Sequence, residues 1–177
     1  MAIQIGAKPD SGFDDPIGML VDCHRRIERS LHVLCVVADR AHDRPLTDQE
    51  SESVQSALRY FRSGGQRHTC DEEESLFPRL RAEFDSGSFK ELTALESDHR
   101  NANELHLAVD SLYSAWIASG QLSSDEEQRL VSATIQLKQL YEAHIQIEER
   151  IVFPRAAEML DSGTIEAIGQ EFRARRE

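Results

Sequence analysis

The chain has 177 residues, of which 32 are acidic and 20 basic, so its formal net charge is −12 at pH 7. This length suits one domain with a sizeable core, and the negative charge disfavours binding to nucleic acid or to an anionic membrane surface. The start lacks a basic flank followed by an apolar run, no stretch is long and apolar enough to span a membrane, and the three cysteines form no CxxC pair. We therefore expect a cytoplasmic protein with free thiols that contacts neither membranes nor nucleic acid.

The N-terminal region changes character at residue 14. Residues 1–13 are small and polar without periodicity, so we expect a flexible tail followed by a single domain over 14–177. Asp15 before Pro16 is typical of a helix start, with the acid as cap and proline in the first turn. Apolar residues then recur at spacings of three and four, and His24 lies within that stripe. The first helix is therefore expected to turn His24 toward the core.

A second helix is predicted from Thr47 toward Pro78. Thr47 with Glu50 is a capping-box pattern, and Pro78 is expected to end or kink the helix. A third helix is predicted between Ser88, which has Glu91 three residues on, and Gly120.

A fourth helix is predicted to start at Ser123 or Ser124, each with a glutamate three residues on, and Pro154 is expected to close its main run. Residues 163–174 are expected to form a short C-terminal helix, and no strand hairpin is indicated. Short connections between long helices predict an all-α, up-down-up-down antiparallel four-helix bundle with a short C-terminal helix.

One sequence unit occurs twice. The segments 68–73 (HTCDEE) and 144–149 (HIQIEE) share the pattern His-x-x-x-Glu-Glu, and Phe-Pro-Arg follows each at the same distance. A lone histidine precedes each copy, His24 by 44 residues and His99 by 45. Because residues four apart share one helix face, each unit presents a histidine and a glutamate together.

The four histidines are expected at one level of the bundle. Each lies eight to eleven residues from the start or the proline end of its predicted helix, and the helices alternate in direction. The inward groups at this level, our candidate metal ligands, are His24, His68, Glu72, His99, His144 and Glu148. Four imidazoles and two carboxylates favour borderline metals, and they divide as two histidines per ion with both glutamates bridging. We therefore expect two non-haem iron ions with an oxo or hydroxo bridge and open positions for a small ligand.

A histidine on an apolar helix face is more often a hydrogen-bonded core residue than a ligand. Buried Glu72 and Glu148 resist that interpretation, because no inward lysine or arginine is evident to pair with them. Other positions stay open: Glu28, Glu73 and Glu149 as further ligands or outer acids, His106 and Tyr141 as cavity wall, and Gly64-Gly65 as a helix contact, a bulge or a ligand path.

These motifs resemble the hemerythrin family, specifically bacterial hemerythrin-like proteins with an HHE cation-binding domain. The resemblance rests on Asp15-Pro16-Ile17 before His24, on the two His-x-x-x-Glu units with Phe-Pro, and on His99, and it covers roughly residues 14–160. It implies a four-helix bundle with a non-haem di-iron centre.

The chain departs from the oxygen-carrying hemerythrins at two positions. Asn103 stands where they have a second histidine one turn after the third-helix ligand, and Glu148 stands where they have a bridging aspartate. Reversible oxygen transport is therefore disfavoured.

Three different functions are compatible with these sequence features. The first is a di-iron protein that interacts with dioxygen, nitric oxide or peroxide, for sensing, storage or detoxification. The second is a di-iron enzyme with catalase-like or ferroxidase activity, or a protein related to iron-sulfur repair. The third is a metal-free or zinc-occupied interaction bundle with an acidic exterior.

Overall fold

The computed structural model describes residues 10–40, 43–83 and 90–177, and every regular element within those ranges is helical. The elements in chain order are α1 (Pro16–Arg40), α2 (Asp48–Tyr60), η1 (Phe61–Gly65), α3 (Gln66–Cys70), η2 (Asp71–Leu76), α4 (Phe77–Glu83), α5 (Lys90–Ser119), α6 (Ser124–Ile147), η3 (Glu148–Val152), α7 (Phe153–Met159) and α8 (Ser162–Ala174).

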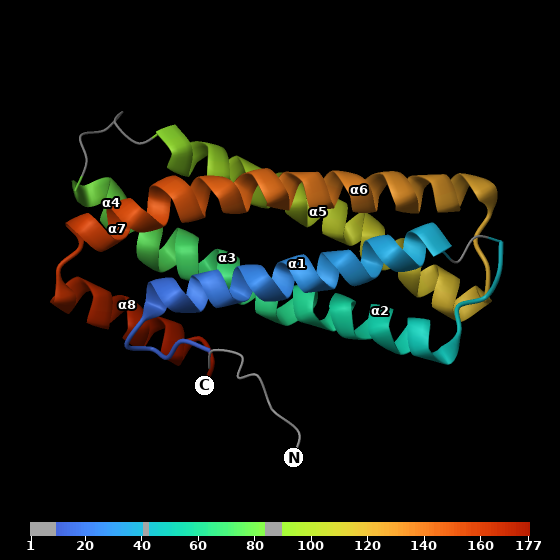
Figure 1. Cartoon of the computed structure of the whole chain (residues 1–177), viewed down its shortest axis with the longest axis horizontal. Coiled ribbons are helices and arrows are strands. Elements are labelled where there is room, and N and C mark those ends of the chain that lie inside the picture. The colour runs from blue at the N-terminus through green and yellow to red at the C-terminus, as the bar shows by residue number, and fades with distance from the viewer. Residues whose placement is uncertain (1–9, 41–42, 84–89) are drawn as a thin grey trace, which may run out of the picture.

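Four long helical rods make up the bundle (Figure 1). Helix α1 is the first rod and α5 the third. The second runs without interruption from α2 through α4, and the fourth from α6 through α7. Helix α1 packs on α2 and α6, and α5 packs on α6. The predicted all-α four-helix bundle with a short C-terminal helix is confirmed.

Local capping signals set most helix starts. The side chain of Asp15 accepts a hydrogen bond from the backbone N–H of Gly18 at 2.9 Å, as a cap on α1 should. Thr47 caps α2 and Ser123 caps α6, each in a complete capping box with the glutamate three residues on. Gly120 ends α5 in the left-handed region, at φ +80°. The predicted Ser88 start lies outside the described residues.

The two prolines do not end their rods. The sequence predicts an end or kink at Pro78 and an end at Pro154, but the helices continue to Glu83 and Met159. A π-helical segment precedes each proline, so Phe77 and Phe153 donate their backbone N–H groups to carbonyls five residues back. This wider turn accommodates a residue that lacks an N–H and would crowd the preceding turn. The prediction that Pro154 closes the fourth helix is therefore wrong.

The hydrophobic core has two parts along the bundle. The larger part includes Leu34, Val109 and Trp116 and lies toward the end where α2 and α6 start. The smaller part includes Leu20, Phe77, Phe153 and Phe172 and lies at the end that α8 covers. Both parts border the level of the predicted metal ligands.

Helix α8 is held to the bundle by a buried ion-pair network. The fully buried carboxylate of Asp71 accepts hydrogen bonds from Arg175 at 2.9 Å and from Arg176 at 2.6 Å. Because a buried charge is costly unless it is paired, these contacts fasten the C-terminus beside η2. The predicted helix at 163–174 is present and starts at Ser162.

Residues 1–9 of the predicted flexible tail lie outside the described residues. The remaining tail positions contact the bundle: the N–H of Ser11 donates to Asp22 at 2.6 Å, and the guanidinium of Arg173 lies 4.9 Å from the centre of the Phe13 ring. Gly169 leaves room for the backbone of Phe13, which a Cβ at that position would strike. The single domain over 14–177 stays a prediction.

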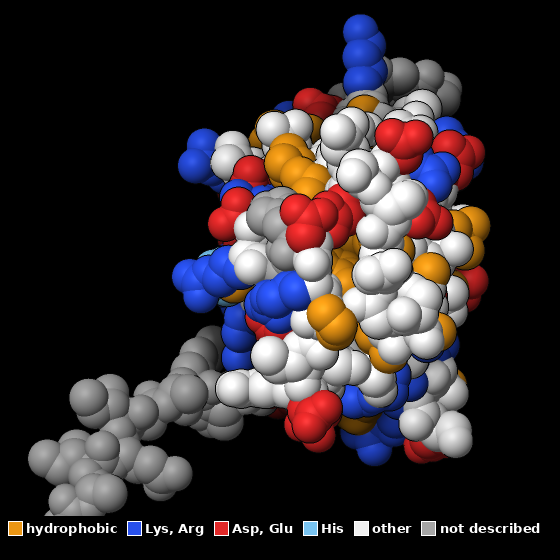
Figure 2. Space-filling view, turned by 90° about the vertical axis from the view of Figure 1, so that its right-hand side faces the viewer, with side chains coloured by type: hydrophobic (Ala, Val, Ile, Leu, Met, Phe, Trp, Pro, Cys, Tyr) orange, Lys and Arg blue, Asp and Glu red, His pale blue; other side chains and the backbone are white. Residues whose placement is uncertain are grey.

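None of the helices in the described part of the chain combines the length and apolar character needed to cross a membrane. Figure 2 shows the end of the bundle where α2 and α6 start. There, acidic and basic side chains are intermixed and hydrophobic side chains occur in small groups.

Candidate metal centre

The structure brings together all six side chains that the sequence nominates. The ligand atoms fall into two groups, each within 4.8 Å: His24, His68, Glu72 and Glu148 form one, and Glu72, His99, His144 and Glu148 form the other. We call them the first and the second position. All six side chains are buried, and they come from all four rods.

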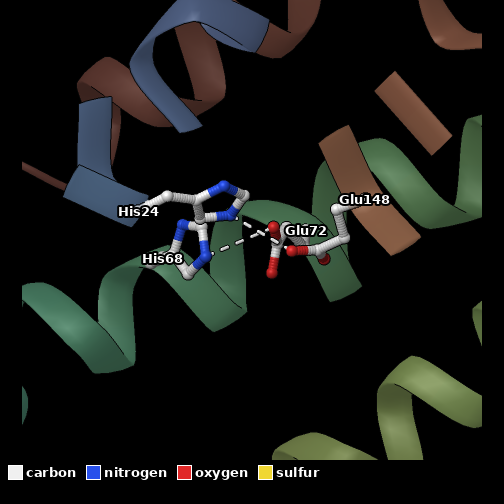
Figure 3. A group of neighbouring side chains, drawn as sticks. All are labelled: His24, His68, Glu72 and Glu148. Atoms are coloured by element: carbon white, nitrogen blue, oxygen red, sulfur yellow. Dashed lines mark ion pairs between the residues drawn. The ribbon is translucent and has the colours of Figure 1, made fainter. Parts of the chain in front are cut away.

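The two glutamates are shared in a regular way. Glu72 places Oε1 3.4 Å from Nε2 of His68 and Oε2 3.3 Å from Nε2 of His99. Glu148 places Oε2 3.1 Å from Nε2 of His24 and Oε1 3.2 Å from Nε2 of His144. Each carboxylate therefore faces one oxygen toward each position, and every histidine points Nε2 inward. Figure 3 shows the first position.

Several buried polar atoms of this centre lack hydrogen-bond partners within the described residues. Both carboxylate oxygens of Glu72 and of Glu148, and Nε2 of His24, make no hydrogen bond within the described residues. Their contacts with histidine nitrogens, at 3.1–3.4 Å, are not hydrogen bonds. Burying unpaired carboxylates costs several kcal/mol, about 1–3 for each unsatisfied group and more when it is charged. A cation at each position would supply the missing charge.

Comparison with known proteins agrees with this geometry. The model of the family described as the hemerythrin HHE cation binding domain matches residues 15–156. The chain belongs to the hemerythrin HHE cation-binding domain family. A Haemophilus influenzae protein described only as uncharacterized is 29% identical over 168 residues, which cover 93% of this chain and 92% of that protein. The fold and the cation-binding character of this HHE protein follow from the family.

Burial gives two imidazoles of the HHE centre, those of His68 and His99, the protonation state that metals require. Burial lowers the pKa of His68, and the neighbouring His24 adds to the effect. Burial likewise lowers the pKa of His99, with His144 as the next cause. These two rings are therefore neutral at physiological pH, and neutral imidazole is the form that binds a metal ion.

The pKa values of the two carboxyl groups of the HHE centre are shifted in opposite directions. Burial raises the pKa of Glu72, and the adjacent charge of Glu148 raises it further. Burial also disfavours charge on Glu148, but its contacts with His144 and His24 outweigh burial and lower its pKa. Without a cation, burial and the charge of Glu148 therefore favour a proton on Glu72. Metal binding would release that proton and make both groups available as ligands.

Acidic side chains contact the outer ring nitrogen, Nδ1, of three of the four histidines and so orient their rings. Nδ1 of His24 lies 2.9 Å from Glu149, and Nδ1 of His99 lies 2.7 Å from Glu73. Nδ1 of His144 lies 3.5 Å from Asp98, at the limit of a hydrogen bond. A carboxylate at Nδ1 keeps the proton on that nitrogen and leaves Nε2 free for a metal.

The second glutamate of each His-x-x-x-Glu-Glu segment, Glu73 or Glu149, therefore contacts the outer nitrogen of a histidine and belongs to neither position. The sequence left the roles of Glu73 and Glu149 open and did not single out Asp98. Its place directly before His99 is a signal that could have found it. Arg25 was not among the residues that the sequence pattern indicated, and its guanidinium donates to both oxygens of Glu149 at 3.0 and 2.9 Å.

The other residues whose roles the sequence left open lie outside the two metal positions. Glu28 pairs with Arg25 at 3.0 Å, is about half exposed, and belongs to neither position. Tyr141 and His106 hydrogen-bond to each other at 3.0 Å, outside both positions. Gly64 and Gly65 lie in the π-helical segment η1, so the bulge interpretation is correct, and Gly65 lines a cavity beside the centre.

Replacing Glu149 with glutamine is expected to weaken metal binding at the first position by about 10–100-fold, because His24 loses the acid that orients its ring. Glu28→Gln is the matched control, since both glutamates contact Arg25 but only Glu149 contacts His24. Titration of metal-depleted protein with ferrous iron in the presence of a competing chelator measures the change. Equal affinities in the two variants would contradict a supporting role for Glu149.

Proposed function

We propose that this protein is a non-haem di-iron protein that interacts with a small oxidant or gas: dioxygen, nitric oxide or peroxide. One observation carries the proposal: Glu72 and Glu148 each face one oxygen toward each of two histidine pairs. That arrangement suits two ions held side by side and bridged by both carboxylates.

The donor set fits iron. Each position offers two imidazole nitrogens and two carboxylate oxygens, a mixture that favours iron, zinc or copper over magnesium or calcium. Four protein donors would complete a tetrahedral zinc ion, whereas a six-coordinate iron would keep room for further ligands. A pair of irons supplies open coordination positions for a small ligand and the capacity to change oxidation state.

The residues around the centre shield it and hold it in place. The ring of Phe153 stacks on His24 with centroids 5.4 Å apart, and the ring of Phe77 stacks on His99 at 6.2 Å. Both phenylalanines are buried and follow the two π-helical segments that carry Glu72 and Glu148. These contacts exclude water from one side of the centre and limit the rotation of the two rings.

Elemental mass spectrometry of freshly purified protein, with an ultraviolet-visible spectrum of the same sample, tests the proposal. About two irons per chain are expected in the native protein, with absorption from an oxygen bridge between them. His68→Ala should lose that absorption and fall to about one ion, because His68 belongs to the first position alone. The exposed His32 provides the control, since His32→Ala should keep both ions.

Zinc in place of iron, or a metal content that His68→Ala leaves unchanged, would contradict the di-iron proposal. It would favour a structural bundle instead.

A further inference from the structure

A cavity of about 660 Å³ opens on the side of the bundle between the second rod and α5. Its wall includes Leu58, Phe61, Gly65, His99, His106 and Tyr141. His99 belongs to the second position, and neither His24 nor His68 lines the cavity. Among the six candidate ligands, His99 alone lines the cavity, so the cavity borders the second position and not the first.

The cavity is much larger than a diatomic gas needs. One water molecule occupies about 30 Å³ in the liquid, and sites for small organic molecules measure roughly 300–1,000 Å³. The cavity falls within the second range, so its size matches an organic molecule.

The wall favours a neutral, largely apolar ligand. Leu58, Phe61 and Ala102 are buried apolar side chains on its surface. At the rim, Arg62 donates to both oxygens of Asp110, at 2.5 and 2.6 Å, and Glu73 is bound to His99. The charges of Arg62 and Asp110 are compensated by each other, so this pair does not select an anion or a cation.

His106 and Tyr141, both on the cavity wall, carry one more hydrogen-bond donor than their contacts within the described chain use. Burial lowers the pKa of His106 to about 4, so its ring is neutral and carries one N–H. That N–H and the O–H of Tyr141 share a single hydrogen bond, at 3.0 Å between Nε2 and Oη. Whichever group donates, the other donor stays unpaired within the described chain. A ligand with an acceptor oxygen would satisfy it.

We propose that this cavity binds a neutral organic hydroperoxide, with its oxygen end beside Tyr141 and His99 and its apolar part along Leu58 and Phe61. The hydroperoxide class rests on the proposed function, because the oxygen end would lie beside His99, a candidate ligand of the second position. The cavity, its apolar wall and its unpaired donor do not depend on the metal.

Binding of 2-phenyl-2-propanol, the unreactive alcohol that corresponds to cumene hydroperoxide, tests the proposal by saturation-transfer NMR or calorimetry. Saturable binding is expected in both the purified and the metal-depleted protein. Cumene, which has the same carbon skeleton without the oxygen, should bind about tenfold more weakly, the approximate value of one hydrogen bond.

Two tryptophan variants locate the site. Asn103 lies on the cavity wall, and Asn103→Trp should weaken binding of the alcohol by about tenfold or more through steric exclusion. Asn101 is exposed on the same helix but does not line this cavity, so Asn101→Trp should bind the alcohol like the native protein.

If the alcohol shows no saturable binding, or if the two variants bind it equally well, this inference is overturned even when iron is present. Saturable binding that Asn103→Trp blocks supports the cavity site, and iron content is measured separately on the same samples. A protein that binds the alcohol but holds no iron would overturn the di-iron proposal and the hydroperoxide class with it, while the cavity would stand as an organic-ligand site.

Discussion

Replacement of Glu72 with glutamine is expected to remove metal from both positions at once. Glu72 faces one oxygen toward each position, and the neutral amide of similar shape cannot supply the bridging negative charge. Iron content should fall from about two per chain to near zero, whereas His68→Ala should keep about one. Elemental mass spectrometry of the two variants side by side measures the contrast. One iron retained by Glu72→Gln would contradict a shared role for this glutamate.

The same variant should make the metal-free protein more stable at neutral pH. The pKa of Glu72 is raised in the folded protein, so the folded state holds this proton more tightly than the unfolded state does. Stability of the metal-free native protein should therefore decline as the pH rises above about 4.5, the ordinary value for a glutamate, and through the folded-state pKa. Glutamine does not titrate and avoids that decline.

Urea unfolding of both metal-free proteins at pH 5 and pH 7.5 tests this expectation. The advantage of Glu72→Gln should be larger at pH 7.5 and reach about 1–3 kcal/mol, the cost of a buried group without a partner. If the difference in free energy of unfolding between the two proteins is the same at both pH values, the buried carboxyl group carries no such cost.

Removal of the metal is expected to lower the thermal midpoint by roughly 5–11 °C. A ligand at one hundred times its dissociation constant stabilises the folded state by about 2.7 kcal/mol, and each kcal/mol shifts the midpoint of a chain of this size by roughly 2–4 °C. The effect should be large here because the metal would compensate two buried carboxyl groups that form no ion pair with lysine or arginine in the described chain.

Circular dichroism melts before and after chelation, and after iron is restored, measure this change. His32→Ala should show the same shift as the native protein, and Glu72→Gln should show almost none. A chelator effect of equal size in Glu72→Gln would assign the stabilisation to metal bound elsewhere.

Local sequence signals account for much of the fold. The capping residues Asp15, Thr47 and Ser123 mark three helix starts correctly, because a side chain three residues from the backbone group that it caps acts within one turn. The His-x-x-x-Glu spacing places both side chains of each unit on one face for the same reason. The sequence signals do not predict the continuation beyond Pro154, since a π-helical turn depends on packing as well as on the proline itself.

By itself, the sequence determined the bundle, the six inward side chains and their common level, all of which follow from helical periodicity and from distances along the chain. Only the tertiary structure decided which oxygen of Glu72 or Glu148 faces which histidine and that Glu149 supports His24 from 125 residues away. It also decided that a cavity reaches His99 alone among the four histidines. These features depend on how each helix is rotated about its axis and how closely it approaches its neighbours. Packing of the whole core sets those quantities, and spacing within one helix does not contain them.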